Sequence, residues 1–396
     1  MKIATASQSK TDKESINHAW TSLEEQLGGQ PNFVIAHYSC DTQPVEVINV
    51  VNARSANTRL HGGTSCLGVI SERGFHSEQG SGLGLMGFFD PGGAYGVAAA
   101  EIGDNPLEAA KQAVMHALDD ADRPGEVPAI IYMTAAPGFE ELLIEGIAEI
   151  VGQDVPISGG SSADNSVSGE WHQIANHQHY KNAVVVSVMF PSNEVLFGFL
   201  SGYEPTDKKG IVTKAENRLL MEIDHKPAAE IYNSWSEHKF DDVMKEGGNI
   251  LSQCTMYPLG RVVGEVGGVP YFRLSHPDNI TADKYITLFS EVSEGDEVFL
   301  MQGTQDSLVS RAGRVASSAL NTFATEQTDI AGALVVYCAG CMLTVQDRLD
   351  EVVAGLTAAL PNTPILGTFT FGEQGCFVGG ENRHGNLMIS VMLFTK

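Results

Sequence analysis

The sequence predicts an α/β fold in two parts, in which repeated βαβ-like units form buried sheets flanked by helices. An unbroken apolar stretch, typical of a strand buried on both faces, occurs three times in the chain. Each copy leads through a turn and a helical or loop stretch to a second short strand that contains glycine. The composition agrees with this class, because 43% of the 396 residues are hydrophobic and 42 are glycine, which allows one large core or two ordinary ones.

The three units are laid out alike. Their first strands are predicted at 33–38, 129–133 and 333–337, and their return strands at 62–65, 156–162 and 364–368. Apolar residues at helical spacing predict helices over 139–150 in the second unit and 345–360 in the third. Thr344 and Asp347 have the spacing of a capping box for this last helix, and Pro361 would end it. Further helices are expected at 11–27, 106–120, 227–237 and 305–324.

A polar run at 202–210 separates the first two units from the rest and holds two adjacent lysines in an otherwise acidic chain. We therefore place a domain boundary there, with one part over 30–205 and the other over 210–395. Neither part carries a kinase, cyclase or DNA-binding motif. Any signalling output would have to pass through a separate protein.

The charge balance excludes two classes of partner. With 49 acidic and 24 basic side chains, the net charge is −25, and binding to nucleic acid or to an anionic membrane surface needs clustered Lys and Arg instead. The sequence also lacks a secretory signal and any stretch of about 18 apolar residues that could cross a membrane. We expect a cytoplasmic protein, which could form a homo-oligomer.

A small-ligand pocket is expected beyond the carboxyl ends of the three strands, where ligands bind in open α/β sheets. The loops there are 37–40, 134–138 and 338–341. Two matching glycine-hydroxyl turns lie nearby, and their amides and hydroxyls suit a small polar ligand; their residues are Gly63, Thr64, Ser65, Gly160, Ser161 and Ser162. The same turns could equally be a structural requirement of the repeated unit.

The usual enzyme signatures are absent from the sequence. The run 82–87 has the spacing of a dinucleotide fingerprint, but no strand precedes it and no helix opens after it. No Walker, His-Glu-x-x-His or Gly-x-Ser-x-Gly motif occurs. We therefore expect a binding protein rather than an enzyme.

Four cysteines form the most specific candidate metal site. Cys338 and Cys341 are spaced so that both thiolates could reach one metal from a single turn, Cys376 belongs to the same unit, and Cys254 could supply a fourth ligand. This count suits an iron–sulfur cluster or a structural zinc; the alternative is four buried cysteines that never meet. His37, in an apolar strand at the pocket edge, could ligate a haem iron or be a satisfied core histidine.

The chain resembles the FIST sensory family over nearly its whole length. The likeness lies in the glycine-hydroxyl turns at 62–65 and 159–162, in the strand and return at 333–340 and 364–367, and in a Phe-Gly-Glu motif that ends at Glu373. Where the family is expected to have Arg after Cys-Ala-Gly, this chain has Cys341. That difference creates the Cys-x-x-Cys pair.

With this cysteine set the chain looks most like the NosP group of nitric oxide sensors within that family. The resemblance implies a haem or iron–sulfur cofactor, nitric oxide as the ligand and a sensor histidine kinase as the partner. It also allows a metal-free sensor, in which Thr64, Ser65, Ser161, Ser162 and Glu373 hold an amino acid or similar ligand. A third alternative is a cysteine-dependent enzyme with Cys338 as nucleophile and Glu373 or a histidine as base.

Overall fold

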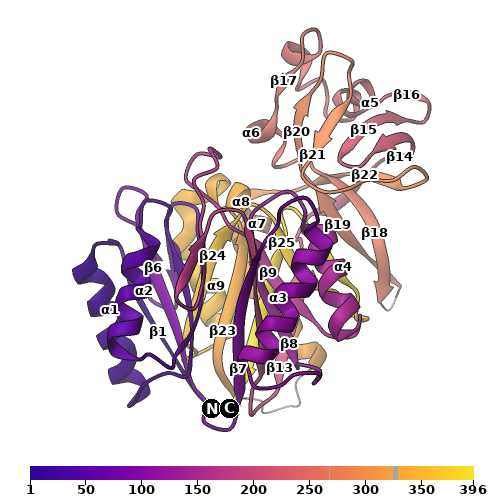
Figure 1. Ribbon diagram of the computed structural model, residues 1–396. Helices are drawn as coiled ribbons and strands as arrows, with labels where there is room; N and C mark the ends of the chain where they lie inside the picture. The colour runs from indigo at the N-terminus through magenta and orange to yellow at the C-terminus, as the bar shows by residue number, and fades with distance from the viewer. Residues whose placement is uncertain (267, 324–328) are drawn as a thin grey trace.

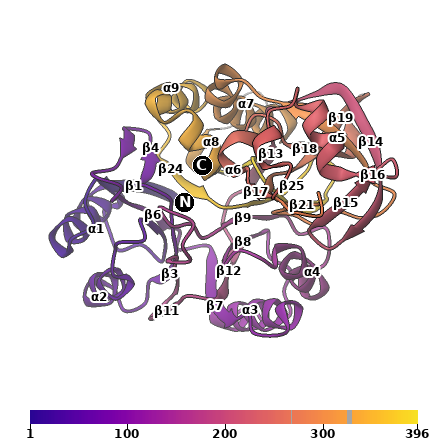
Figure 2. The same ribbon diagram turned by 90° about the horizontal axis from the view of Figure 1, so that it is seen from above.

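The computed structural model describes residues 1–266, 268–323 and 329–396. Within these residues the chain forms three six-stranded sheets and one larger sheet. The three sheets surround a common centre with their helices on the outside, and the larger sheet forms a separate lobe at one end (Figures 1 and 2). The two chain termini lie side by side at the end opposite this lobe (Figure 1).

The first sheet has the order β1-β6-β2-β3-β10-β11. Its βαβ unit consists of β2 (Phe33–Tyr38), α2 (Pro44–Arg54) and β3 (Arg59–Thr64), with β2 and β3 parallel. The other elements are β1 (Lys2–Gln8), α1 (Lys13–Leu27), β6 (Leu83–Phe89), β10 (Gln173–Ala175) and β11 (Gln178–Tyr180). The glycine-rich run at 82–87 lies largely in β6, which pairs antiparallel with both β1 and β2.

The second sheet has the order β26-β25-β9-β8-β12-β7. Here β8 (Ile130–Ala135), α4 (Glu140–Val151) and β9 (Ile157–Ser161) form the unit, again with parallel strands. The sheet is completed by β7 (Ala94–Glu101), β12 (Ala183–Phe190), β25 (Glu373–Cys376) and β26 (Asn382–Gly385), and α3 (Pro106–Asp120) packs on it.

The third sheet has the order β13-β27-β23-β24-β4-β5. Its parallel pair is β23 (Ile330–Cys338) and β24 (Ile365–Thr370), joined through α8 (Ala339–Thr344), η2 (Gln346–Arg348) and α9 (Leu349–Ala359). The remaining elements are β4 (Val69–Ser71), β5 (Gly74–His76), β13 (Val195–Leu200), β27 (Ile389–Thr395) and α7 (Gln305–Phe323). Strands from the first half of the chain thus complete a sheet of the second half, and β25 and β26 do the reverse.

The fourth sheet forms the lobe, which we define as residues 204–302. Its order is β17-β20-β21-β15-β14-β22-β18-β19, with β16 paired to β15. Residues 204–210 of the polar run form the first part of β14, where the chain enters this lobe. The lobe elements are β14 (Glu204–Glu216), β15 (Leu219–Ile223), β16 (Lys226–Pro227), α5 (Ala228–Trp235), η1 (Asp241–Val243), β17 (Gly248–Asn249), α6 (Leu251–Cys254), β18 (Leu259–Val266), β19 (Val269–Ser275), β20 (Pro277–Ile280), β21 (Ile286–Leu288) and β22 (Glu297–Gln302).

The predicted α/β class is confirmed, and so are the six strands of the three units. Every residue of β2, β8 and β23 is buried, because helices cover the outer face of each sheet and the inner faces share one apolar core. That core includes Phe33 from the first sheet, Ile130 from the second and Leu334 from the third. Continuous apolar strands are what such burial on both faces requires.

The helix predictions are confirmed except at two places. The capping box at Thr344 and Asp347 is wrong: α9 begins after Arg348 without a side-chain cap, and the Thr344 hydroxyl instead donates to the carbonyl of Gly340 inside α8. Helix α2 was not predicted, and residue 324 of the predicted helix 305–324 lies outside the described residues. None of the helices that the structure describes combines the length and the apolar character needed to span a bilayer.

Candidate functional site

The three return strands end at a shared junction in the middle of the molecule. The amide of Ala163 donates to the carbonyl of Thr64 at 3.0 Å, the amide of Phe371 to Ser161 at 3.1 Å, and the amide of Cys66 to Phe369 at 3.0 Å. These bonds link the end of each return strand to the next sheet. The sequence repeat therefore brings the glycine-hydroxyl turns together.

Three side chains of these turns bond to the protein itself. The Thr64 hydroxyl accepts from the amide of His172 at 3.1 Å, the Ser65 hydroxyl accepts from the amide of Phe369 at 2.9 Å, and the Ser161 hydroxyl donates to Glu140 at 2.6 Å. Ser162 is fully buried, and its hydroxyl has no hydrogen-bond partner among the described residues. A Cβ on Gly63 or Gly160 would overlap a threonine methyl of the neighbouring sheet, so sheet packing requires both glycines.

Glu373 lies at the same junction. Its carboxyl oxygens accept from the Thr370 hydroxyl at 2.9 Å and from the Met388 amide at 2.9 Å. Burial raises the pKa of this carboxyl well above its usual value. The two hydrogen bonds fix Glu373 between Thr370 and Met388, and the lining of the cavity described next does not include it.

A cavity of about 690 Å³ lies beyond the carboxyl ends of β8, β23 and β24, where these strands face the lobe. We call it the junction cavity. Two of the three loops expected around a pocket contribute to its wall, through Pro137 and Gly138 after β8 and through Cys338 to Gly340 after β23. Among the described residues, none of 37–40 does. The lobe contributes Leu251, Thr255, His276 and Phe289.

Two buried side chains on the cavity wall carry a polar atom without a partner. His276, between β19 and β20, is 5% exposed, and Asn386, after β26, is 3% exposed. The amide of His276 donates to Asn386 Oδ1 at 3.2 Å. In the part of the chain that the structure describes, His276 Nε2 and Asn386 Nδ2 have no hydrogen-bond partner, which is unusual for buried polar atoms.

Cys338 lines the cavity and Cys341 lies behind it, both at the start of α8. Burial acts to raise the pKa of Cys341, but the hydrogen bond from Cys338, the charge of Arg311 and the hydroxyl of Tyr203, 3.4 Å from the sulfur, lower it to about 6. The hydrogen bond to Cys341 and burial raise the pKa of Cys338 well above its usual value. The thiol that faces the cavity is therefore the protonated member of the pair.

Arg311 is the buried counter-charge of this pair. It is 1% exposed, stacks 4.5 Å from the ring of Tyr337 and donates through Nη1 to two carbonyls, those of Ser201 at 3.0 Å and Leu387 at 2.8 Å. No carboxylate within the described ranges forms a salt bridge with it. A buried guanidinium favours the ionised form of a nearby thiol.

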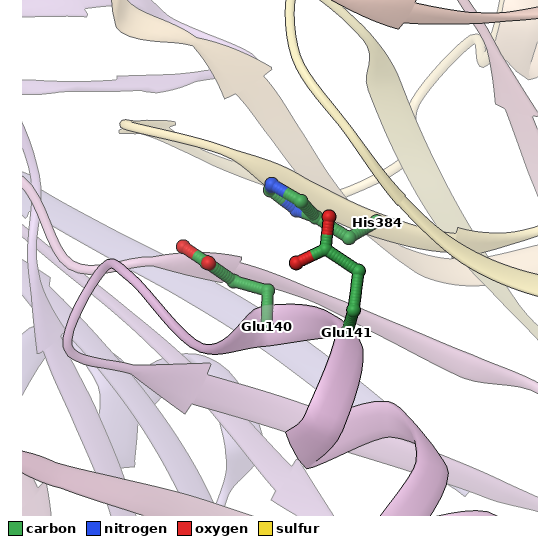
Figure 3. A group of neighbouring side chains, drawn as sticks. All are labelled: Glu140, Glu141 and His384. Atoms are coloured by element: carbon green, nitrogen blue, oxygen red, sulfur yellow. The ribbon is translucent and has the colours of Figure 1, made fainter. Parts of the chain in front are cut away.

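Glu140, Glu141 and His384 form a compact group beside the cavity (Figure 3). They are the one group of three or more such side chains in the described part of the chain whose ligand atoms lie within 4.8 Å of one another. However, Arg218 Nη2 lies 2.7 Å from Glu140 and 2.6 Å from Glu141. His384 is also engaged, because its Nδ1 lies 3.2 Å from Gln374 Nε2 and its Nε2 lies 3.2 Å from the Phe289 carbonyl.

This group joins the lobe to the three-sheet body instead of presenting open metal ligands. Arg218 belongs to the lobe, whereas both glutamates open α4 of the body. Burial acts to raise the pKa of Glu141, but its positive neighbours and the bond from the Glu291 amide at 2.9 Å lower it to about 2. The ion pairs thus hold both glutamates ionised at neutral pH.

The four cysteines do not gather at one point. The structure brings Cys338 and Cys341 together, but no group of three cysteine sulfurs lies within 4.8 Å in the described residues. The Cys254 thiol donates to the Pro277 carbonyl at 3.1 Å within the lobe, and the Cys376 thiol lies 3.6 Å from the Phe377 carbonyl. These residues do not fit an iron–sulfur cluster, which needs the sulfurs around one centre.

His37 does not fit a haem ligand either. Its ring is buried between the first and second sheets, where Nδ1 lies 3.1 Å from the Gly63 carbonyl and Nε2 lies 2.8 Å from the Tyr132 hydroxyl. Burial lowers its pKa to about 4. With both ring nitrogens engaged and the strand packed on each side, His37 has the environment of a satisfied core histidine.

The sequence did not reveal the residues that define the cavity's chemistry. His276, Asn386, Arg218 and Arg311 belong to no motif, and the partners in each contact are far apart in the chain. His276 and Asn386, for example, are separated by 110 positions. The local signals are the loops 134–138 and 338–341 at the ends of two buried strands, and part of each loop lines the cavity.

Two domain families match most of this chain. Residues 32–226 match the FIST N domain and residues 228–376 match the FIST C domain. The chain therefore belongs to the FIST family, whose domains are sensory and bind ligands in signalling proteins.

Individual similarities are more limited. A segment of 88 residues is 34% identical to part of an uncharacterised protein of Methanocaldococcus jannaschii. The segment covers 22% of this chain and 17% of that protein. Among solved structures, a cyanuric acid hydrolase from A. caulinodans has a TM-score of 0.39 and 9% identity, over 99% of both chains. Phosphoribosylformylglycinamidine synthase II from Thermotoga maritima has a TM-score of 0.23 and 10% identity, over 99% of this chain and 72% of that one. Scores this low support no inference about function.

Proposed function

We propose that the chain is a sensory protein that binds a small organic ligand in the junction cavity without a metal. The observation that carries the proposal is the pair of buried polar atoms, His276 Nε2 and Asn386 Nδ2, that lack partners on the cavity wall. A volume of about 690 Å³ is in the range of small-molecule sites. The sensory character of the family agrees with binding rather than catalysis.

The position of the cavity suggests how binding would be signalled. Its wall combines loops of the three-sheet body with residues of the lobe, so a ligand would contact both. The same interface carries the ion pairs of Arg218 with Glu140 and Glu141. A ligand that binds one arrangement of lobe and body more tightly than another would shift their equilibrium, and a partner protein such as a histidine kinase would read the change.

Nitric oxide sensing through haem or an iron–sulfur cluster was the expectation drawn from the resemblance. His37 and the four cysteines do not fit those groups in this fold, so the proposal does not use them. The ligand that it calls for interacts through hydrogen bonds and apolar contacts.

A cysteine-dependent enzyme is the second candidate, because Cys338 lines the same cavity. Its Sγ and the Cε1 of His276 lie 3.7 and 3.6 Å from the position that a Cβ on Gly340 would take. The raised pKa of Cys338 opposes this reading, since the thiolate is the nucleophile. Rapid labelling of Cys338 by iodoacetamide at neutral pH would favour the enzyme, and slow labelling would favour the sensor.

A thermal-shift screen tests the proposal. The wild-type chain and two variants, Gly340→Leu and Gly355→Leu, would be heated with a library of amino acids, nucleobases and small amides. Gly340→Leu places a side chain between His276 and Cys338, whereas Gly355→Leu makes the same change in α9, where a Cβ meets no atom within 4 Å. A ligand at a hundred times its dissociation constant stabilises the folded chain by about 2.7 kcal/mol.

We expect at least one compound to stabilise the wild type and Gly355→Leu but not Gly340→Leu. Equal stabilisation of all three chains would place the ligand elsewhere, and a library without any stabilising compound would contradict the proposal.

A further inference from the structure

Cys338 and Cys341 occupy the two ends of the first turn of α8. Cys338 is the N-cap residue, with extended backbone angles, and Cys341 is the third residue of the helix. Side chains at these two positions reach toward each other across the turn. Both are free cysteines, and Cys-x-x-Cys pairs in this arrangement can exchange with other disulfides.

The two sulfurs differ in their access to small molecules. Cys338 lines the junction cavity, whereas Cys341 is fully buried and is not part of the cavity wall. A compound that enters the cavity therefore meets Cys338 first. Cys341 can act only on a sulfur that Cys338 has already engaged.

Arg311 gives the pair a buried positive neighbour that has no carboxylate partner in the described ranges. Its Nη1 donates to the carbonyls of Ser201 and Leu387, but its Nε and Nη2 have no hydrogen-bond partner among the described residues. Burial acts to raise the pKa of Cys341, but the hydrogen bond from Cys338 and the charge of Arg311 lower it to about 6. The thiolate of Cys341 offsets the buried guanidinium, and a disulfide, which is neutral, would not.

We propose that Cys338 and Cys341 are a site of reversible oxidation, at which a small organic disulfide in the junction cavity exchanges with the pair and leaves the two sulfurs joined. First, the Cys338 thiolate attacks one sulfur of the small disulfide, whose S–S bond breaks to release one thiolate. The Cys341 thiolate then attacks the Cys338 sulfur, and the mixed disulfide breaks to release the second thiolate. The two electrons and the one proton of the pair leave with the two released thiol groups, so the small disulfide is the oxidant.

Arg311 favours the reverse reaction. A free thiol in the cavity attacks the Cys338 sulfur, and Cys341 leaves as a thiolate beside the guanidinium. Because a stabilised thiolate leaves readily, the pair stays reduced until small disulfides accumulate. This inference goes beyond ligand binding, since it uses the cavity only as a path to Cys338.

Tyr203 connects the pair to the lobe. Its hydroxyl lies 3.4 Å from Cys341 Sγ and donates to the carbonyl of Thr255, in the lobe, at 2.9 Å. Tyr203 directly precedes β14, where the chain enters the lobe, and a Cβ on Gly303, where the chain leaves it, would overlap the Tyr203 ring. Loss of the charge on Cys341 therefore changes the surroundings of a side chain that contacts both connections.

A redox titration of the full wild-type chain tests the inference. The protein is equilibrated in mixtures of 2-mercaptoethanol and its disulfide, free thiols are blocked with N-ethylmaleimide, and the mass of the tryptic peptide 315–348 is measured. This peptide contains Cys338 and Cys341 and no other cysteine. In the oxidising mixtures we expect it to be unblocked and lighter by two hydrogen atoms, and to take up two blocking groups after reduction.

Two variants identify the source of the effect. Arg311→Met should shift the equilibrium toward the disulfide by at least about tenfold, because the thiolate loses a charged partner. Cys40→Ser is the control: Cys40 is half-buried and is not part of the cavity wall, so the equilibrium should change by less than about twofold.

Amide hydrogen exchange of the wild type tests the connection to the lobe. The amide of Gly303 donates to the carbonyl of Met256 in the lobe at 3.1 Å. Oxidation should speed its exchange by at least about fivefold, as for the loss of one hydrogen bond. An unchanged rate in the oxidised chain would refute the connection through Tyr203.

A wild-type peptide 315–348 that stays doubly blocked in every mixture would overturn the inference, and this result needs no variant. An Arg311→Met chain that folds and titrates like the wild type would overturn the role of the buried guanidinium.

Discussion

The substitution Gly340→Ala tests whether the junction cavity exists where the structure places it. Gly340 is the second residue of α8 and its Cα lies at the cavity wall. A Cβ there would lie 3.6 Å from His276 Cε1, 3.7 Å from Cys338 Sγ and 3.8 Å from Leu387 Cδ2. These are ordinary van der Waals distances, so the added methyl fits without moving its neighbours.

The expected effect is a stabilisation. Replacing a helical glycine by alanine contributes about 0.5–1 kcal/mol, and partial burial of one methyl adds up to about 0.8 kcal/mol. The free energy of unfolding should therefore rise by roughly 0.5–1.8 kcal/mol. Gly355→Ala in α9 is the matched control, because a Cβ there meets no atom within 4 Å and only the helix contribution is expected.

Urea unfolding followed by tryptophan fluorescence measures both variants against the wild type. We expect Gly340→Ala to raise the midpoint at least as much as Gly355→Ala, and to weaken binding of any ligand that contacts His276. A loss of more than about 1 kcal/mol in Gly340→Ala would show that the site is already filled, and the reasoning that places a cavity there would be refuted.

Three further results are expected. Arg311→Met should raise the pKa of Cys341 above about 6 toward that of an ordinary thiol, measured from the carbon-13 NMR shift of its Cβ, and an unchanged pKa would disprove the buried ion pair. Arg218→Met should lower the free energy of unfolding by about 3–5 kcal/mol at pH 7, because it leaves two buried carboxylates unpaired. The pKa of Glu141 is lowered from 4.5 to about 2, so its ionised form stabilises the wild type above pH 4.5 and this contribution is lost as the pH falls toward 2. In urea unfolding, the stability that Arg218→Met loses relative to the wild type should therefore be smaller near pH 4 than at pH 7. An equal loss at both pH values would count against the ion pair. Gly63→Ala should lower the melting temperature through overlap with the Thr134 methyl, and Thr134→Ser, which removes that methyl and keeps the hydroxyl, should restore part of the loss; no recovery in the double variant would mean that sheet packing does not explain the glycine.

The fold was predictable from the sequence because burial on both faces leaves a local signal. The strand at 33–38 and its two counterparts read as unbroken apolar runs, and the glycines that follow mark the places where two sheets approach closely. The interleaving of the sheets leaves no such signal. Nothing in the residues of β4 or β25 indicates that each belongs to a sheet of the other half of the chain.

The candidate site was predictable only in part. The loop at 338–341 was correctly expected near a pocket, because it follows a buried strand. Its chemistry depends on contacts between residues far apart in the sequence: Arg311 beside Cys341, and Asn386 beside His276. A Cys-x-x-Cys spacing is also compatible with a pair that shares one proton beside a buried cation, which spacing alone does not distinguish from a metal site.

The iron content of the chain after anaerobic purification tests the central claim most directly, because the account describes a ligand site that works without a metal. We predict no haem absorption band, no acid-labile sulfide and iron far below one equivalent per chain. A stoichiometric iron centre that is lost in the double variant Cys338→Ser, Cys341→Ser, or in His37→Ala, would contradict the account and restore the metal-based reading.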